Sequence, residues 1–239
     1  MSIFTVTLRG QLLRPRAGGL LALSVVVAAV AIIIRSTADD AYEAYAELSG
    51  RLLVPLVIAL ISLIVGVNAF GDEREDGTMP LLIATCTPRW RMTLEKTLAA
   101  MLATWLICLP ATLGLAIMGA GADLSGSKVF SSVVGASVLA VMGYVSVFVL
   151  LSLVLNRAVL VGMGYVVLWE GVIANYANGA RSLSIGAYGR RVLASGMRSG
   201  DIPFTVPDVA TTTAVIVPLV VAAIAVSLAA IRLPHVEVR

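Results

Sequence analysis

The sequence predicts an all-α integral membrane protein with six transmembrane helices, and three observations carry this prediction. Hydrophobic residues make up 59% of the 239-residue chain and charged residues only 13%, whereas soluble domains carry about 25% charged residues. Six apolar segments approach the length of about 20 residues that a helix needs to cross a hydrocarbon core. Their apolar residues run continuously instead of alternating, which excludes a membrane β-barrel.

The six predicted spans belong to a single transmembrane domain, residues 1–239, and the sequence has no internal repeat. They cover residues 17–35, 51–70, 97–120, 129–155, 159–177 and 209–232. Small residues at helical spacing form a stripe in the fourth span, and such stripes allow helices to approach closely. The stripe consists of Ser132, Ala136, Ala140 and Gly143. We interpret it as a packing face, with a dimer seam as the alternative.

The segments outside the spans predict the orientation of the chain. Residues 1–16 combine an apolar side with three arginines, which favours an amphipathic helix lying in the membrane interface. The loop 178–208 mixes apolar residues with Gly and Arg, so we expect short helices at the outer surface. With both termini inside, the inner segments hold more Lys and Arg than the outer ones, and the first outer loop, 36–50, is acidic. This bias favours cytoplasmic termini.

The densest group of charges lies between the second and third spans, in residues 71–96. Thr78 fits a helix N-cap and Pro80 a first helical turn, so residues 79–86 are expected to form a short helix. Acidic residues precede this helix, and basic residues follow Pro88. We predict an element on the cytoplasmic face that docks a soluble partner. The alternative is a solvated loop whose charges only set topology.

Glu170 is the one carboxyl near the middle of a predicted span. A charged carboxyl at that depth costs about 2.5–3.5 kcal/mol on insertion scales, so we expect it to be protonated or partnered inside the bundle. Two interpretations stay open. Glu170 lines a pathway or gate together with Trp169 and Asn175, or it is a buried hydrogen-bonded group that fixes helix packing.

No catalytic or metal-binding motif is present. The only histidine is His235, and neither a zinc motif nor a nucleophile elbow occurs. Residues 121–128 have the glycine spacing of a phosphate-binding loop, but Ser precedes Lys and no strand leads into the segment. The absence of a basic run argues against nucleic acid. Cys86 and Cys108 do not form a disulfide framework.

The charged segment resembles the first cytoplasmic loop of type-2 ABC exporter permeases, the membrane subunits of bacterial drug, polysaccharide and lipid exporters. The resemblance rests on Glu73-x-Glu75-x-Gly77-Thr78, Leu81-Leu82, Pro88-Arg89 and Lys96. The six spans, the interfacial N-terminal helix and the long last outer loop agree with that family. The sequence Leu168-Trp169-Glu170-Gly171 adds a weaker similarity. Thr85–Thr87 is more polar than the family's usual aliphatic residues.

The resemblance implies a multi-pass permease of the bacterial plasma (inner) membrane that is not itself an enzyme. Two ABC ATPase subunits, which bind ATP and Mg, would pair with two permease chains, identical or related, and this chain would hold no cofactor. The loop would be the coupling helix that seats in the ATPase and drives alternating access. The residues in that role are Glu73, Glu75, Gly77, Thr78, Leu81, Leu82, Pro88 and Arg89.

Two other functions compete with this one. A membrane scaffold or assembly factor would dock a cytoplasmic protein through the same loop. An ion-coupled carrier acting alone would use Glu170 as its proton site. The lipid bilayer surrounds the chain in every case.

Overall fold

The computed structural model describes residues 3–38, 40–75, 88–120, 126–155, 157–174, 183–198 and 202–233. Helices and short connections make up these ranges, and no strand occurs among them, which confirms the all-α prediction. The elements are α1 (Ile3–Leu12), α2 (Pro15–Thr37), α3 (Ala41–Glu47), η1 (Leu48–Ile58), α4 (Ala59–Glu75), α6 (Arg89–Ala120), α7 (Gly126–Val154), α8 (Ala158–Gly164), η2 (Tyr165–Ile173), α10 (Ile185–Ala194) and α11 (Thr211–Arg232).

Five helices in the described ranges are long and apolar enough to cross a membrane. They are Pro15–Thr37, Ala41–Gly71, Arg89–Ala120, Gly126–Val154 and Thr211–Arg232, and each overlaps a predicted span. At the predicted fifth span, 159–177, α8 and η2 form a shorter apolar helix, Ala158–Ile173. The count of six spans therefore stays a prediction.

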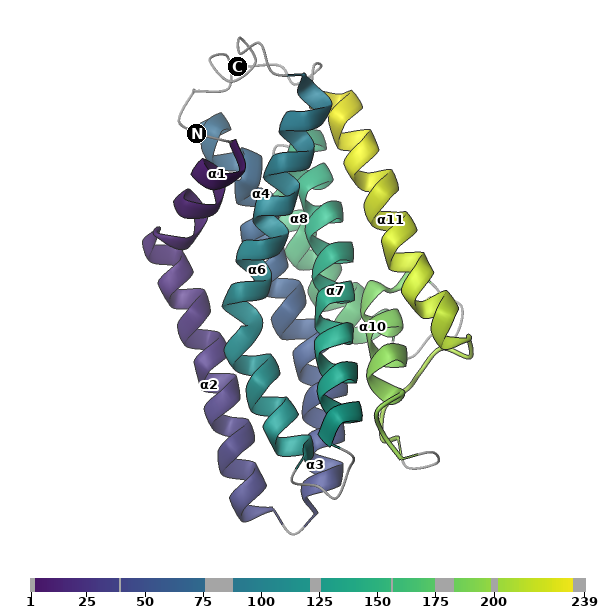
Figure 1. Cartoon of the computed structure of the whole chain (residues 1–239). Coiled ribbons are helices and arrows are strands. Elements are labelled where there is room, and N and C mark those ends of the chain that lie inside the picture. The colour runs from purple at the N-terminus through teal and green to yellow at the C-terminus, as the bar shows by residue number, and fades with distance from the viewer. Residues whose placement is uncertain are drawn as a thin grey trace.

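The long helices lie side by side along one direction (Figure 1). α7 packs against α4, α6, α10 and α11, so it lies at the centre of the bundle. α1, the end of α4, the start of α6 and the end of α11 gather at one end, which we call the loop end (Figure 1). The end of α2, α3 and the start of α7 lie at the opposite, far end.

α2 and α6 run in the same direction and pack against each other. Contacts near Pro110 and Gly114 explain how closely the two helices approach. Pro110 lacks an N–H and disturbs the hydrogen bonding of α6. The neighbouring Ala111 N–H donates to Ser24 Oγ of α2 at 3.1 Å. Gly114 lets the two backbones approach, because a Cβ on it would lie 2.7 Å from the Cα of Ala28.

We therefore expect Gly114→Val to separate α2 from α6. Overpacking at such a contact costs about 1–3 kcal/mol, so the melting temperature of the detergent-solubilised chain should fall. Gly19→Val is the matched control, because a Cβ on Gly19 of α2 meets nothing within 4 Å. Equal melting temperatures for the two variants would contradict this account of the interface.

The second long helix begins earlier than predicted, at Ala41 instead of residue 51. Asp40 is its N-cap, and its Oδ1 accepts from the backbone N–H of Tyr42 at 3.0 Å and of Glu43 at 3.1 Å. Tyr45 is fully buried, so these residues belong to the bundle. The acidic composition of 36–50 therefore reflects a capped helix start more than an outer loop.

α10 is the short helix expected in the loop 178–208, but it does not lie on the surface. Every residue of α10 except Arg191 is buried, and the helix packs against α7, α11 and η1. The small-residue stripe of α7 receives it: a Cβ on Gly143 would lie 2.8 Å from Ile185 Cγ2, and one on Gly189 would contact Ala140 Cβ. The stripe is thus a packing face within this chain.

Candidate functional site

The predicted coupling residues are divided between the ends of α4 and α6. Glu73 and Glu75 lie in the last turn of α4, which continues past the predicted end of the span at residue 70. Pro88 directly precedes α6, and Arg89 is the first residue of that helix. The remaining coupling residues lie outside the described part of the chain, as does the expected short helix 79–86. They are Gly77, Thr78, Leu81 and Leu82.

The start of α6 presents a polar and aromatic surface. The carbonyl of Pro88 accepts from the N–H of Arg91 at 3.0 Å and of Met92 at 3.2 Å, which begins the helix. Pro88 and Arg89 are exposed, and Trp90 is 61% exposed. The Arg91 Nε forms an ion pair of 2.9 Å with Glu95 Oε1. This surface is open to a partner at the loop end.

Glu95 also binds the N-terminal helix α1 to α6. Its Oε2 accepts from the backbone N–H of Phe4 at 3.3 Å, so α1 lies against the first turns of α6. Ile3, Leu8 and Leu12 are partly buried against the core. The apolar side predicted for residues 1–16 therefore contacts the bundle.

Lys96 connects the two helices that carry the coupling residues. Only 1% of it is exposed, and its Nζ donates to the carbonyl of Ala69 in α4 at 3.0 Å. The same ammonium lies 4.6 Å from the centroid of the Phe70 ring, a favourable cation–π distance. In the sequence, Lys96 stands out only as part of the family motif and as a lysine just before a long apolar run.

Glu170 is a fully buried carboxylate that holds the start of α10. Ser184 Oγ donates to its Oε2 at 2.6 Å, the Gly186 N–H to its Oε1 at 3.2 Å, and Tyr165 Oη to the same Oε1 at 3.1 Å. Ser184 is itself the N-cap of α10 and accepts from Ala187 N–H. The oxygens of Glu170 thus face the N-terminus of α10, where backbone N–H groups need acceptors.

The position of Gly186 shows how closely α10 approaches this carboxylate. A Cβ on Gly186 would lie 2.7 Å from both Glu170 Oε2 and the Tyr144 hydroxyl. These contacts favour the packing interpretation of Glu170. Trp169, its neighbour in η2, is half-buried, and Asn175 lies outside the described residues. Ser184 and Gly186 could not be predicted as partners, because nothing in the sequence links them to Glu170.

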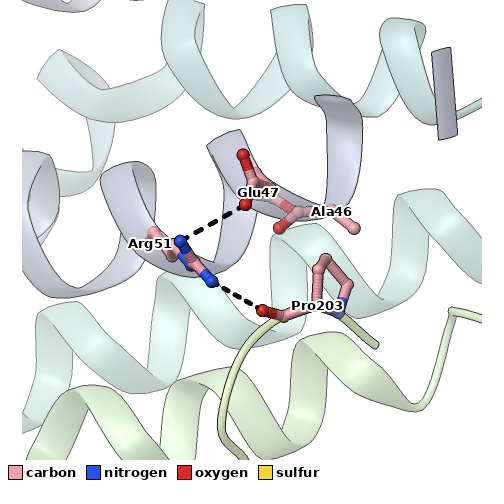
Figure 2. Close-up of polar contacts among 5 residues, drawn as sticks. Ala46, Glu47, Arg51 and Pro203 are labelled. Carbon is pink, nitrogen blue, oxygen red and sulfur yellow. Dashed lines mark hydrogen bonds and ion pairs between the residues drawn. The ribbon is translucent and has the colours of Figure 1, made fainter. Parts of the chain in front are cut away.

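A pocket of about 430 Å³ lies next to Glu170. Its lining residues are Arg51, Pro55, Leu56, Glu170, Gly171, Arg190, Pro203, Phe204 and Thr205. Figure 2 shows how Arg51 is held: Nη1 lies 3.3 Å from Glu47 Oε1, and Nη2 donates to the carbonyl of Pro203 at 2.8 Å. Within the described ranges, no three His, Cys, Asp or Glu side chains converge as metal ligands.

Comparison with known proteins identifies the family of the chain. A family model described as "ABC-2 family transporter protein" matches residues 12–232. The match includes the long apolar helices of the described ranges, the predicted coupling residues and Glu170. A search of curated proteins found no match.

Proposed function

Because the chain belongs to the ABC-2 family of transporter proteins, we propose that it serves an ATP-driven exporter and couples to separate ATPase subunits through residues 73–89. The family and the long apolar helices make it a multi-pass membrane permease of an ABC transporter, a transport subunit and not a catalytic one. The ATPase partner and the direction of transport belong to the proposal.

The observation that carries this proposal is the arrangement of Glu73 and Glu75. They lie in the last turn of α4, where the helix dipole disfavours acidic residues by about 0.3–1 kcal/mol each. The helix dipole gives no reason for acidic residues at this position, which supports a role toward a partner. Arg89, exposed at the start of α6, lies at the same end of the bundle.

The proposed mechanism is a rigid-body switch. Two ATPase subunits, binding ATP and Mg²⁺, close on each other and push the segment between α4 and α6. Lys96 joins these helices through Ala69, so the push moves both together. A second permease chain, identical or related, completes the pathway, and the bundle alternates between inward- and outward-facing states. The loop end and both termini face the cytoplasm of a bacterial cell, across its inner membrane.

The contacts of Glu170 argue against the carrier alternative. A proton-coupled carrier requires this carboxyl to release and take up protons during transport. Three donors hold its oxygens at 2.6–3.2 Å, and these contacts give the side chain a fixed structural role at the start of α10. No contact in the described chain specifically favours the scaffold alternative.

Co-purification tests the proposal. The full-length chain, tagged and solubilised from the membranes of its host, is expected to retain an ABC ATPase that hydrolyses ATP. Arg89→Glu should reduce the amount retained, whereas Lys128→Glu, an exposed cation at the start of α7, should not. If no ATPase is retained under conditions in which the chain stays folded, the proposal is wrong.

Lys96→Met is expected to weaken the connection between α4 and α6. The substitution keeps a flexible apolar chain but removes the ammonium that bonds to Ala69. A hydrogen bond of a charged group contributes about 1.5–3 kcal/mol, so the melting temperature should fall. The turnover of the ATPase complex during transport should fall more than for the control Lys128→Met. Unchanged turnover at lowered stability would show that Lys96 does not transmit motion.

A further inference from the structure

The pocket beside Glu170 has a lining that no proposed role has yet used. It lies between η1, η2, α10 and the segment 203–205 that precedes α11. Pro55, Glu170, Arg190 and Phe204 are buried, whereas Arg51, Gly171 and Thr205 are exposed. The buried set forms the floor of the pocket and the exposed set its rim.

The charges of the lining favour an anion. Arg190, only 1% exposed, contributes a cation to the floor, and Arg51 contributes a second one to the rim. Among the lining residues that the structure describes, Glu170 is the one acid, and its oxygens accept from Tyr165, Ser184 and Gly186. Guanidinium groups bind phosphate and carboxylate with paired hydrogen bonds.

Arg51 is positioned in advance and still reachable. Its Glu47 and Pro203 contacts, drawn in Figure 2, fix the guanidinium, while 61% of its side chain stays exposed. An ion pair this exposed contributes about 0–1 kcal/mol, so an incoming anion competes with it at little cost. The Phe204 ring packs over Gly50, and this contact holds Phe204 in place in the pocket lining.

The remaining lining is apolar and leads onto an apolar surface. Pro55 and Phe204 of the floor are apolar, as are Leu56 and Pro203 beside them. Gly171 on the rim lies on one exposed face of η2 with Leu168 and Val172, which are 61% and 49% exposed. A molecule bound at the two arginines therefore has an apolar path beside it.

We propose that this pocket binds the anionic head group of an amphipathic molecule. Arg51 and Arg190 hold the phosphate or carboxylate, and the exposed face of η2 receives the apolar chain. The binding rests on these residues alone and does not depend on coupling to an ATPase. The permease therefore has a binding site for anionic amphipathic molecules.

Native mass spectrometry of the purified full-length chain tests the proposal with three probes. Phosphatidylglycerol carries an anionic head, phosphatidylcholine of the same chain length a zwitterionic one, and inorganic phosphate has no apolar chain. We expect phosphatidylglycerol to bind at least tenfold more tightly than either. Arg51→Gln should weaken its binding about tenfold, the loss of one charged hydrogen-bonding group. Arg35→Gln, at an exposed arginine of α2, should not weaken it.

Three results would overturn the proposal. One is equal binding of the two lipids, and another is an equal loss in Arg51→Gln and Arg35→Gln. The third is displacement of phosphatidylglycerol by an equal concentration of inorganic phosphate, which would make the pocket a site for free anions. Because Arg51 is exposed, its substitution leaves the packing of the bundle intact, and an unchanged melting temperature verifies this.

Discussion

Reversing two charges at the end of α4, Glu73→Arg with Glu75→Arg, is expected to abolish coupled ATP hydrolysis and transport while the permease stays inserted. Close charge pairs at protein interfaces contribute about 1.5 kcal/mol or more each, so two reversals should weaken docking by about a hundredfold or more. The stability of α4 should not fall, because the C-terminus of a helix favours cations. The measurement is ATPase activity and transport in reconstituted vesicles, with membrane insertion checked by alkaline extraction.

The control for this variant reverses two exposed acids in α3 and just before α11, Glu43→Arg with Asp208→Arg. α3 and the start of α11 lie away from the loop end (Figure 1). The control changes the net charge by the same amount. Transport should continue in the control. Undiminished transport and ATPase stimulation in Glu73→Arg with Glu75→Arg would remove these residues from the coupling role.

Replacing the buried carboxylate, Glu170→Leu, is expected to release α10 from the bundle. The Ser184 hydroxyl, the Gly186 N–H and the Tyr165 hydroxyl would each lose this acceptor. A buried polar group left unsatisfied costs about 1–3 kcal/mol, so the loss should reach several kcal/mol. The melting temperature of the purified chain should fall steeply, and Glu170→Gln should fall less because its amide oxygen still accepts.

Accessibility of α10 separates the two interpretations of Glu170. Ala187 is fully buried, so Ala187→Cys should resist a water-soluble maleimide in the parent protein. The same cysteine should react when combined with Glu170→Leu or Glu170→Gln, and should stay protected with the surface control Asp208→Asn. If Glu170→Gln leaves α10 protected and the melting temperature unchanged but stops transport, the pathway interpretation is right and the packing one wrong.

The sequence predicted the parts of this fold that local pattern determines. Long apolar runs predicted the helices α2, α4, α6, α7 and α11. Apart from a closed β-barrel, only a helix satisfies all its backbone hydrogen bonds in lipid. The start of the second long helix was missed, since acidic residues in 36–50 suggested a loop. In the structure Asp40 caps the helix, and Glu47 pairs with Arg51 one turn later.

The site around Glu170 could not be predicted, because it depends on contacts distant along the chain. A buried glutamate signals that partners exist, but neither periodicity nor spacing identified Ser184 or Gly186 as those partners. The same holds for Lys96, whose acceptor, Ala69, belongs to another helix. The coupling motif was inferred from its residues and the family resemblance, and its role stays a prediction throughout, with Gly77 to Leu82 outside the described residues.

Site-specific crosslinking tests the central claim most directly. A photoreactive amino acid replaces Leu82 in the segment between α4 and α6, and in a second variant replaces Arg35 at the far end. In membranes that contain the complex, light should join the first variant to an ABC ATPase and leave the second unlinked. If Leu82 forms no crosslink to an ATPase that co-purifies with the chain, or if Arg35 forms it equally, residues 73–89 are not where this permease couples to ATP hydrolysis.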